Sequence, residues 1–468
     1  MRCFCPEKPY LPLYTEGTNT KDFLWNFLLL FLLCGTGIYF TIRLRFVQVR
    51  KFGEGWKRVF GGLGRGKSAD RMGMSSFQSL ATAIAAQVGT GNLAGAATAL
   101  LYGGPGAVFW MWVSAFFGMA TIFSEATLAQ KYRTMQDDEV TGGPVYYIRR
   151  AFGGRLGRVL AALFSVFLIF ALGFVGNMVQ SNSIGDAFSS AFGANPVVIG
   201  IAVAAAAGFV FVGGVKRLAS VTEKIVPFMA LFYIVGCLVI VGFHYQNIPE
   251  AFRRIFVGAF SPEAVGGGVL GVTMQKAIQY GVARGLFSNE AGMGSTPHAH
   301  ALAKVKDPCE QGIVAMMGVF IDTFVILTLT ALVVLTTGVL GSGAEGVTLP
   351  QQGFETVFGR FGAAFIAVCM LFFAFSTIIS WYFFGEMNVK YLFGKRAVRF
   401  YALLVVAFLI LGSALKVDFV WALADLFNGL MVIPNLLALL ALSGMVSALL
   451  KRYDSRRLRR RRSRREEE

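Results

Sequence analysis

The feature that most constrains the fold is a series of long apolar segments with few charges. Residues 23–42 form a run of 20 residues without a charged side chain, about the length that a helix needs to cross the hydrocarbon core of a bilayer. Ten more apolar segments follow, at 77–101, 105–130, 157–190, 196–215, 221–243, 268–299, 311–340, 362–391, 400–415 and 418–449. They lack the alternating ten-residue pattern of an outer-membrane barrel. The sequence therefore predicts an all-α polytopic membrane protein with about eleven transmembrane helices.

The composition agrees with a membrane protein. Only 15% of the residues are charged and 55% are hydrophobic, whereas soluble domains average about 25% charged residues. The run at 23–42 is too long for a cleavable signal peptide, and no small-residue cleavage site follows it. We therefore expect this run to remain as a transmembrane helix.

The distribution of Lys and Arg predicts the orientation. If the N-terminus lies outside and the chain crosses eleven times, the cytoplasmic segments carry 34 of these residues and the outside segments carry 7. Positive residues accumulate on the cytoplasmic side, so we expect the C-terminus to be cytoplasmic. The net charge of +17 then requires no nucleic-acid partner. The Arg-rich segment 450–468 resembles a nucleic-acid or lipid patch, and we favour a disordered cytoplasmic tail that rests on anionic headgroups.

Two glycine motifs resemble nucleotide-binding loops. Residues 61–68 (GGLGRGKS) match the phosphate-binding loop, and residues 89–94 (GTGNLA) match the dinucleotide fingerprint. The first lies in a short basic connection and the second in the middle of an apolar segment, so neither has the required α/β surroundings. The only His residues are at 244, 298 and 300, and no zinc-protease motif or nucleophile elbow occurs. We predict that the protein is not an enzyme.

Two apolar segments are interrupted by small and polar residues. The interruptions lie at 87–92 (QVGTGN) and 286–297 (LFSNEAGMGSTP). When the first apolar segment is set aside, the other ten form two sets of five, and each interruption lies in the first segment of its set. Because five is an odd number of crossings, the second set enters the membrane from the opposite side. Interrupted segments at matching positions of inverted repeats indicate a binding site. We divide the chain into an N-terminal helix with a basic loop (1–76), a first repeat (77–243), an outside segment with a second repeat (244–449) and a basic tail (450–468).

The interruptions have a physical interpretation. Unpaired backbone groups in hydrocarbon cost several kcal/mol each, so unwinding persists only where it lines a cavity. Freed amides at the start of a half-helix attract a carboxylate, and freed carbonyls at the end of one attract a cation or an ammonium group. A small zwitterion together with a metal cation satisfies both kinds of end. The alternative is that the glycines only permit close helix packing.

Four motifs give the chain a resemblance to a known family. Residues 87–95 (QVGTGNLAG), 103–110 (GGPGAVFW), 141–147 (TGGPVYY) and 283–294 (ARGLFSNEAGMG) together resemble the alanine-or-glycine:cation symporter family, from about Phe23 to Val446. The resemblance implies a leucine-transporter-type core of two inverted five-helix repeats plus one additional helix. It also implies sodium-driven uptake of alanine or glycine across a prokaryotic plasma membrane, without an organic cofactor.

The resemblance also suggests which residues hold the substrate carboxylate. The amides of Thr90 and Gly91 and the side chain of Asn92 would meet it. Gln180, on the long third helix of the first set, could donate to the same carboxylate or form a hydrogen bond between helices.

The remaining substrate contacts are expected at both interruptions and on the eighth helix of the core. Backbone carbonyls near Gln87, Phe287 and Ser288 would accept from the substrate ammonium. Trp381, one turn beyond Thr377, would close the pocket around the substrate side chain and limit its size.

The cation is expected between the first interruption and the eighth core helix. By resemblance, the hydroxyls of Ser376 and Thr377 and the carbonyl of Phe373 would hold sodium with the carbonyls of Ala85 and Val88. Five oxygens suit a hard cation. Alternatively, the Ser/Thr pair only forms hydrogen bonds to its own backbone.

Intramembrane ionisable residues are functional candidates because they are costly. Arg284 could neutralise Glu290 or Glu125 in a gate, whereas Lys276 lies closer to the outside and could reach the interface. A proton-coupled carrier of another small neutral amino acid remains an alternative. An ion channel is less favoured, because no continuous polar pore or ring of charge is present. The preferred amino acid, the stoichiometry and the oligomeric state stay open.

Overall fold

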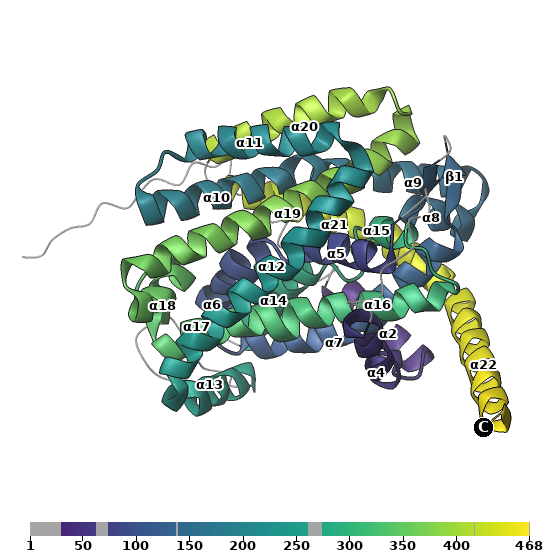
Figure 1. Cartoon of the computed structure of the whole chain (residues 1–468), viewed down its shortest axis with the longest axis horizontal. Helices are drawn as coiled ribbons and strands as arrows, with labels where there is room; N and C mark the ends of the chain where they lie inside the picture. Colours follow the sequence, from purple (N-terminus) through teal and green to yellow (C-terminus); the bar gives the residue numbers. More distant parts are fainter. Residues whose placement is uncertain (1–29, 62–73, 137–138, 261–273, 416, 468) are drawn as a thin grey trace, which may run out of the picture.

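The computed structural model describes residues 30–61, 74–136, 139–260, 274–415 and 417–467. Nearly all of these residues are helical, and the described strands form a single antiparallel hairpin. Figure 1 shows most of the long helices lying side by side along one direction. This bundle is the scaffold on which the interrupted segments are held.

Residues 30–61, the first described part of the chain, form one apolar helix and two short helices. These are α2 (Leu30–Arg43), α3 (Val47–Arg50) and α4 (Phe52–Phe60). The phosphate-loop-like motif at 61–68 lies outside the described residues except for Gly61.

The first predicted repeat is mostly helical, with a break after Gln87. Its elements are α5 (Ser76–Gln87), η3 (Gly91–Gly95), α6 (Ala96–Gly103), α7 (Ala107–Lys131), β1 (Thr134–Gln136), β2 (Glu139–Thr141), α8 (Pro144–Phe152), α9 (Gly154–Leu168), η4 (Ile169–Gly176), α10 (Asn177–Phe192), α11 (Pro196–Val212) and α12 (Gly214–Phe243).

The segment of the second predicted repeat is also mostly helical. Its elements are η5 (Tyr245–Asn247), α13 (Ile248–Phe260), α14 (Met274–Asn289), α15 (Pro297–Ala301), α16 (Pro308–Val319), η6 (Phe320–Leu327), α17 (Thr328–Thr337), η7 (Val339–Gly341), α18 (Thr348–Phe358), α19 (Arg360–Phe393), α20 (Ala397–Ala414) and α21 (Val417–Ala441), and the helix α22 (Ser443–Glu467) continues into the basic tail. The hairpin and the helices α13 and α18 were not predicted from the apolar pattern.

Local sequence signals explain several helix starts. Ser75 and Gln78 form a capping box at the start of α5, in which each side chain bonds the other residue's amide. Asp307 caps α16 through the amide of Cys309 at 3.0 Å, and Pro308 occupies the first helical position. These caps satisfy amides that the first turn of a helix leaves unpaired.

Seven helical segments of the described chain are long and apolar enough to cross a membrane. They are Ala107–Lys131, Gly154–Phe192, Gly214–Phe243, Pro308–Thr337, Arg360–Phe393, Ala397–Ala414 and Phe419–Ala441. Leu30–Arg43 and Pro196–Val212 are shorter apolar helices. The interrupted segments near 77–101 and 274–301 consist of shorter pieces, which explains why they fall outside this group. The prediction of a polytopic helical membrane protein is therefore supported.

The segments between the long helices gather at the two ends of the bundle. Figure 1 shows α13 and α18 toward one end, and α8, β1 and α22 at the other.

The C-terminal tail differs from the expectation of disorder. Residues Ser443–Glu467 form the helix α22, which projects from the end of the bundle in Figure 1. Asp454 of this helix forms ion pairs with Arg50 at 3.5 Å and with Lys51, and Arg457 pairs with Glu54. The expectation was wrong because these partners lie some 400 positions earlier in the chain and leave no local signal.

Candidate functional site

The first interruption begins after Gln87, where backbone amides leave the helical pattern. The amide of Gly89 donates to Asn92 Oδ1 at 3.0 Å, and the amide of Thr90 donates to Gln180 Oε1 at 3.2 Å. A Cβ at Gly89 would lie 2.5 Å from Thr377 Oγ1, so only glycine permits this approach. The unwound turn therefore brings the backbone directly against another helix.

The second interruption lies between α14 and α15. In a continued helix, the amides of Ala291 and Gly292 would bond the carbonyls of Phe287 and Ser288. They instead donate to Asn289 Oδ1 at 3.1 Å and to Glu125 Oε2 at 3.0 Å. The last carbonyls of α14 are consequently released from the helical pattern, as expected for an acceptor of cations or ammonium groups.

This interruption is shorter than the sequence predicted. The residues from Leu286 to Asn289 continue α14, and the non-helical stretch covers 290–296. Three residues of the stretch have a positive φ, namely Glu290 (56°), Gly292 (88°) and Gly294 (81°). Glycine adopts this conformation without a steric penalty, which explains why the chain unwinds here and not at Leu286.

The two interruptions lie next to each other. Gln87 Nε2 donates to the carbonyl of Asn289 at 2.7 Å. A Cβ at Gly91 would lie 3.2 Å from the Cα of Ser288 and 3.4 Å from the ring of Phe287. The freed amides of the first interruption and the freed carbonyls of the second thus line one region.

Four of the five oxygens predicted to hold the cation lie around Thr377, and the fifth, Ser376 Oγ, contacts one of them and also lies 3.4 Å from Met229 Sδ. Thr377 Oγ1 lies 2.7 Å from the carbonyl oxygen of Ala85, 3.4 Å from that of Val88 and 3.0 Å from that of Phe373. Ser376 Oγ lies 2.9 Å from the carbonyl oxygen of Phe373. All of these side chains are buried. We call these five residues the Thr377 oxygen set.

The chemistry of this set fits a hard monovalent cation. Its ligands are neutral oxygens, which sodium-like cations prefer over nitrogen or sulfur. Three are backbone carbonyls, and two are hydroxyls that can turn a lone pair toward a cation. The Thr377 hydroxyl bonds across to α5 as well as to its own helix, so the purely local Ser/Thr alternative does not describe this residue.

The donors assigned to the substrate carboxylate have internal partners. Thr90 donates to Gln180 Oε1 from its amide and also from its hydroxyl. Asn92 differs from the expectation, because its Nδ2 donates to Asp322 Oδ1 at 2.7 Å and its Oδ1 accepts from Gly89. The structure therefore brings Thr90 and Gln180 together and directs the Asn92 amide toward a carboxylate of the protein.

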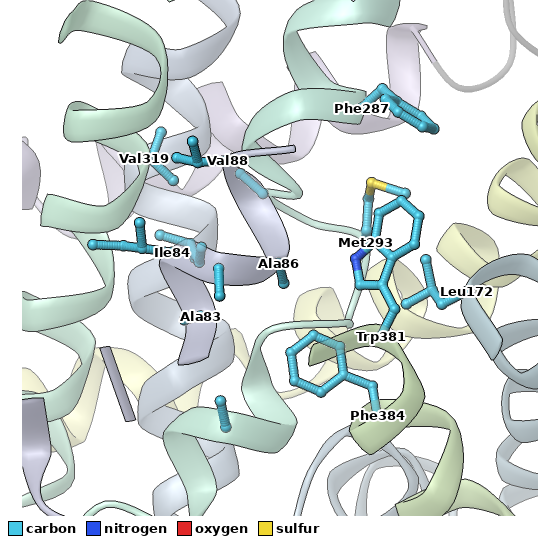
Figure 2. Close-up of a cluster of buried hydrophobic side chains, with 14 of the residues drawn as sticks. Ala83, Ile84, Ala86, Val88, Leu172, Phe287, Met293, Val319, Trp381 and Phe384 are labelled. Carbon is cyan, nitrogen blue, oxygen red and sulfur yellow. The ribbon is translucent and has the colours of Figure 1, made fainter. Parts of the chain in front are cut away.

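Aromatic and apolar side chains lie on another side of this region. Figure 2 shows Met293 and Phe287 near the indole of Trp381, with Ala86 of α5 and Val88 of the first interruption on the opposite side. The rings of Phe287 and Trp381 are edge to face, with centroids 6.2 Å apart. Trp381 also donates from Nε1 to Glu290 Oε1 at 2.6 Å. This bond fixes the indole, as buried Trp N–H groups usually require a partner.

The gate predicted for Arg284 has a different partner. Arg284 pairs with Asp425 of α21, with its terminal nitrogens Nη1 and Nη2 each 3.3 Å from one carboxylate oxygen. Its Cζ also lies 4.9 Å from the ring centroid of Trp421. No ion pair between Arg284 and Glu290 or Glu125 occurs in the described chain. The expected pairing was wrong because Asp425 and Trp421 of α21, distant in sequence, reach Arg284 instead.

The two other carboxylates hold the second interruption in place. Glu125 accepts from the amides of Gly292 at 3.0 Å and Gly294 at 2.9 Å, and from Asn435 at 2.6 Å. Glu290 accepts from Ser295 and Trp381. Charged acceptors form strong hydrogen bonds with backbone amides, so Glu125 stabilises the unwound turn.

Sequence reasoning missed Asp322, Asp425 and Asn435 as members of this region. Asp322 and Asp425 lie inside the apolar segments 311–340 and 418–449. An ionisable residue inside such a segment is a functional candidate by itself, so this signal was available for both carboxylates. Asn435 carries no comparable signal.

Comparisons with known proteins agree with this geometry. Residues 15–467 match the model of the sodium:alanine symporter family. The chain is 42% identical over 451 residues to the sodium/alanine symporter of Methanococcus maripaludis, covering 94% of this chain and 97% of that protein. It is also 42% identical over 438 residues to an uncharacterised transporter of Haemophilus influenzae, covering 93% and 95%.

A solved structure supports the fold. The transporter MhsT, crystallised with L-phenylalanine, aligns with a TM-score of 0.57 at 12% identity, over 81% of this chain and 98% of that chain. At this identity the likeness concerns the fold alone, and it agrees with the predicted leucine-transporter type. The family match, the relatives and the helical apolar spans support a multi-pass membrane transporter and not an enzyme. The chain belongs to the sodium:alanine symporter family.

Proposed function

We propose that the protein imports a small neutral amino acid, alanine or glycine, by sodium symport with alternating access. The observation that carries this proposal is the contact of Thr377 Oγ1 with three carbonyl oxygens, where the first interruption meets α19, together with the Ser376 hydroxyl on the same Phe373 carbonyl. A dehydrated sodium ion requires such a set of oxygen ligands. Sodium bound there would fix the unwound turn and so prepare the substrate site beside it.

The carboxylate of the amino acid is proposed to bind at Thr90 and Gly91. Gln180 Oε1 already accepts the Thr90 amide and hydroxyl, so this neutral oxygen occupies a position that suits a carboxylate oxygen. An anionic acceptor forms hydrogen bonds roughly twice as strong as a neutral one. A substrate carboxylate would therefore displace Gln180 Oε1, and the Gln180 side-chain amide could then donate to it.

The ammonium group is proposed to meet the carbonyls of Phe287 and Ser288. The amides that would have bonded these carbonyls are diverted to Asn289 and Glu125. These carbonyls also lie at the C-terminal end of α14, where the helix dipole favours positive charge. The side chain of the substrate would then face Trp381 and Met293.

The wider arrangement is proposed from the same pattern. Eleven transmembrane helices form an N-terminal helix (with 1–76), a first repeat (77–243) and an inverted second repeat (244–449), followed by the basic helix of 450–468. The N-terminus lies outside a prokaryotic plasma membrane, and the Arg-rich helix approaches anionic headgroups.

The outer gate is proposed to consist of Arg284 and Asp425. Their ion pair joins α14 to α21, and Trp421 lies between Arg284 and Phe287, with its ring centroid 5.0 Å from that of Phe287. Breaking one ion pair and one aromatic contact would let the two helices separate. Glu290 and Glu125 act beside the gate by holding the second interruption.

Uptake of labelled alanine into proteoliposomes tests the function. An inward sodium gradient should drive accumulation of alanine, and removal of the gradient should abolish this accumulation. Full accumulation in sodium-free buffer with a proton gradient would refute sodium coupling. Sodium flux without coupled alanine movement would indicate a channel. Competition by glycine and by larger neutral amino acids then ranks the substrates.

A further inference from the structure

The short helix α4 has an aromatic face that the described chain leaves uncovered. Phe52, Trp56 and Phe60 follow one another at every fourth position, so their side chains share one side of the helix. Their ring centroids are 6.3 Å apart between Phe52 and Trp56 and 4.4 Å apart between Trp56 and Phe60. Trp56 is 47% exposed and Phe60 is 41% exposed. We call these three residues the aromatic ladder, and such an exposed apolar row marks an interaction surface.

The neighbouring face of α4 packs on the helix α16. Gly55 and Val59 are buried there. A Cβ at Gly55 would lie 2.7 Å from Met317 Sδ, so the two helices approach closely. The ring of Phe52, at the edge of the ladder, lies edge to face with that of Phe320, with centroids 4.9 Å apart. The protein therefore covers only one border of the ladder.

The polar face of α4 is held by ion pairs. The buried carboxylate of Glu54 pairs with Arg58 at 3.2 Å and with Arg457 of α22. Arg58 also pairs with Glu310 of α16 at 3.2 Å. Because both the polar face and the Gly55 face have partners in the protein, α4 cannot turn to hide its ladder. The ladder must therefore face whatever surrounds the molecule.

The helix α4 lies at the level where the apolar helix α2 ends. Arg50, two residues before α4, donates from Nε to the carbonyl of Arg45 at 2.8 Å and from Nη2 to that of Leu44 at 3.1 Å. These two carbonyls follow directly on Arg43, the last residue of α2. With nine residues, α4 is too short to cross a bilayer itself. Its position is that of the boundary between the hydrocarbon core and the headgroups.

The side chains of this face match a phospholipid. Helices that lie in the membrane interface carry Trp and Phe on one face and basic residues beside it, and Trp is enriched at this depth. Lys57 follows Trp56, is exposed, and forms no ion pair with any residue that the structure describes. A basic side chain at the cytoplasmic surface is attracted to anionic headgroups. A second protein copy would need about 20 residues on each side of a stable interface, far more than this ladder offers.

We infer that α4 lies in the inner-leaflet interface, with the aromatic ladder among the upper acyl chains and Lys57 at the phosphate of an anionic phospholipid. The inference goes beyond the proposed function and rests only on its orientation, which places residues 43–71 on the cytoplasmic side. This lipid surface is separate from the basic tail, since Arg457 of that tail is engaged by Glu54.

The bound lipid acts on the transport site through η6. Phe320, which contacts Phe52, begins this element. Two residues later, Asp322 accepts from Asn92 at 2.7 Å and from Ser288 at 2.9 Å, one residue from each interrupted segment. An α4 anchored by lipid keeps this segment in place. The anchoring therefore favours the arrangement of the interruptions that binds the amino acid.

Fluorescence quenching of the full-length protein in vesicles tests the lipid contact. The difference in emission between the wild type and Trp56→Phe gives the signal of Trp56. Phospholipids brominated in the upper part of their acyl chains should quench this signal at least about twofold more than phospholipids brominated near the chain ends. Quenching by acrylamide from the water would place Trp56 in the cytoplasm, and quenching by neither reagent would place it against protein. Either result overturns the inference.

Uptake of alanine into vesicles of different charge tests the anionic headgroup and its effect on transport. In the wild type, the half-saturating alanine concentration should be about fivefold lower in phosphatidylglycerol than in phosphatidylcholine, the effect of one lysine near an anionic surface. Lys57→Gln and Trp56→Ser should each remove most of this difference. Phe393→Ser is the matched control, because Phe393 is a 67% exposed aromatic residue at the end of α19, and it should keep the full difference.

The two measurements separate this inference from the proposed function. A wild type that does not carry alanine refutes the proposed function, whereas quenching of Trp56 still decides where α4 lies. Equal alanine affinities of the wild type in the two lipids overturn the inference. So does a lipid difference that is as large in Lys57→Gln and Trp56→Ser as in the wild type.

Discussion

Replacing Thr377 with Val removes one hydroxyl from the Thr377 oxygen set with little change in side-chain volume. In the structure this hydroxyl contacts the carbonyl oxygens of Ala85, Phe373 and Val88 at 2.7, 3.0 and 3.4 Å. Its loss takes one of five oxygens from the proposed sodium ion. It also removes the bond that holds the end of α5 against α19.

The size of the effect follows from the interaction that is lost. A hydrogen-bonding group that contacts a charge contributes about 1.5–3 kcal/mol. Since 1.4 kcal/mol corresponds to a tenfold change, we expect the apparent sodium affinity to fall about 10- to 150-fold. The maximal uptake rate at saturating sodium should change less, because the substrate contacts at Thr90 and Ser288 remain.

The assay is alanine uptake as a function of external sodium at constant ionic strength. Thr377→Ser keeps the hydroxyl and should stay within about threefold of the wild type, well below the loss expected for a ligand. Thr336→Val is the matched control, since Thr336 is a buried threonine that donates only to its own helix, at Leu332. An unchanged sodium affinity in Thr377→Val would refute the placement of the cation.

Three further outcomes follow from the site. Trp381→Leu should let valine and leucine compete with alanine and should weaken alanine binding by about 1–3 kcal/mol, as competition against labelled alanine will measure. Asp425→Asn should lower the unfolding free energy by about 3–5 kcal/mol, because Arg284 loses its buried partner. The double variant with Arg284→Gln should recover much of this loss in a thermal-unfolding assay. Glu125→Gln should lower the unfolding free energy by about 2–3 kcal/mol, because its hydrogen bonds to the second interruption become weaker. A sodium-dependent uptake rate equal to that of the wild type would contradict the supporting role of Glu125.

Much of the architecture was predictable because the apolar segments and their interruptions have strong local signals. The glycines at 89, 91, 292 and 294 marked the unwound turns, and two of them have a positive φ. The start of the second interruption was less predictable. Residues 286–289 contain Ser and Asn, which are weak helix formers, but they continue α14 in the structure.

The partners within the site were harder to predict, because they depend on packing between distant segments. Arg284 pairs with Asp425, 141 positions later, instead of with the nearer Glu290. No periodicity in α14 indicates which helix will face it. Asp322 could have been predicted as a functional candidate, because it is an ionisable residue inside an apolar segment. Its partners Asn92 and Ser288 became apparent only in the folded chain.

The pairing of Gln180 with Thr90, and of Thr377 with Ala85, has a consequence for the return half of the cycle. After releasing its cargo, a carrier must reorient while its polar groups are without ligands, and unpaired groups inside a membrane protein cost several kcal/mol each. Here side chains of the protein satisfy those groups. The energetic barrier to reorientation without cargo is thereby lowered, which favours net accumulation over obligatory exchange. Influx into vesicles should accordingly be little faster when they are preloaded with alanine than when they contain none.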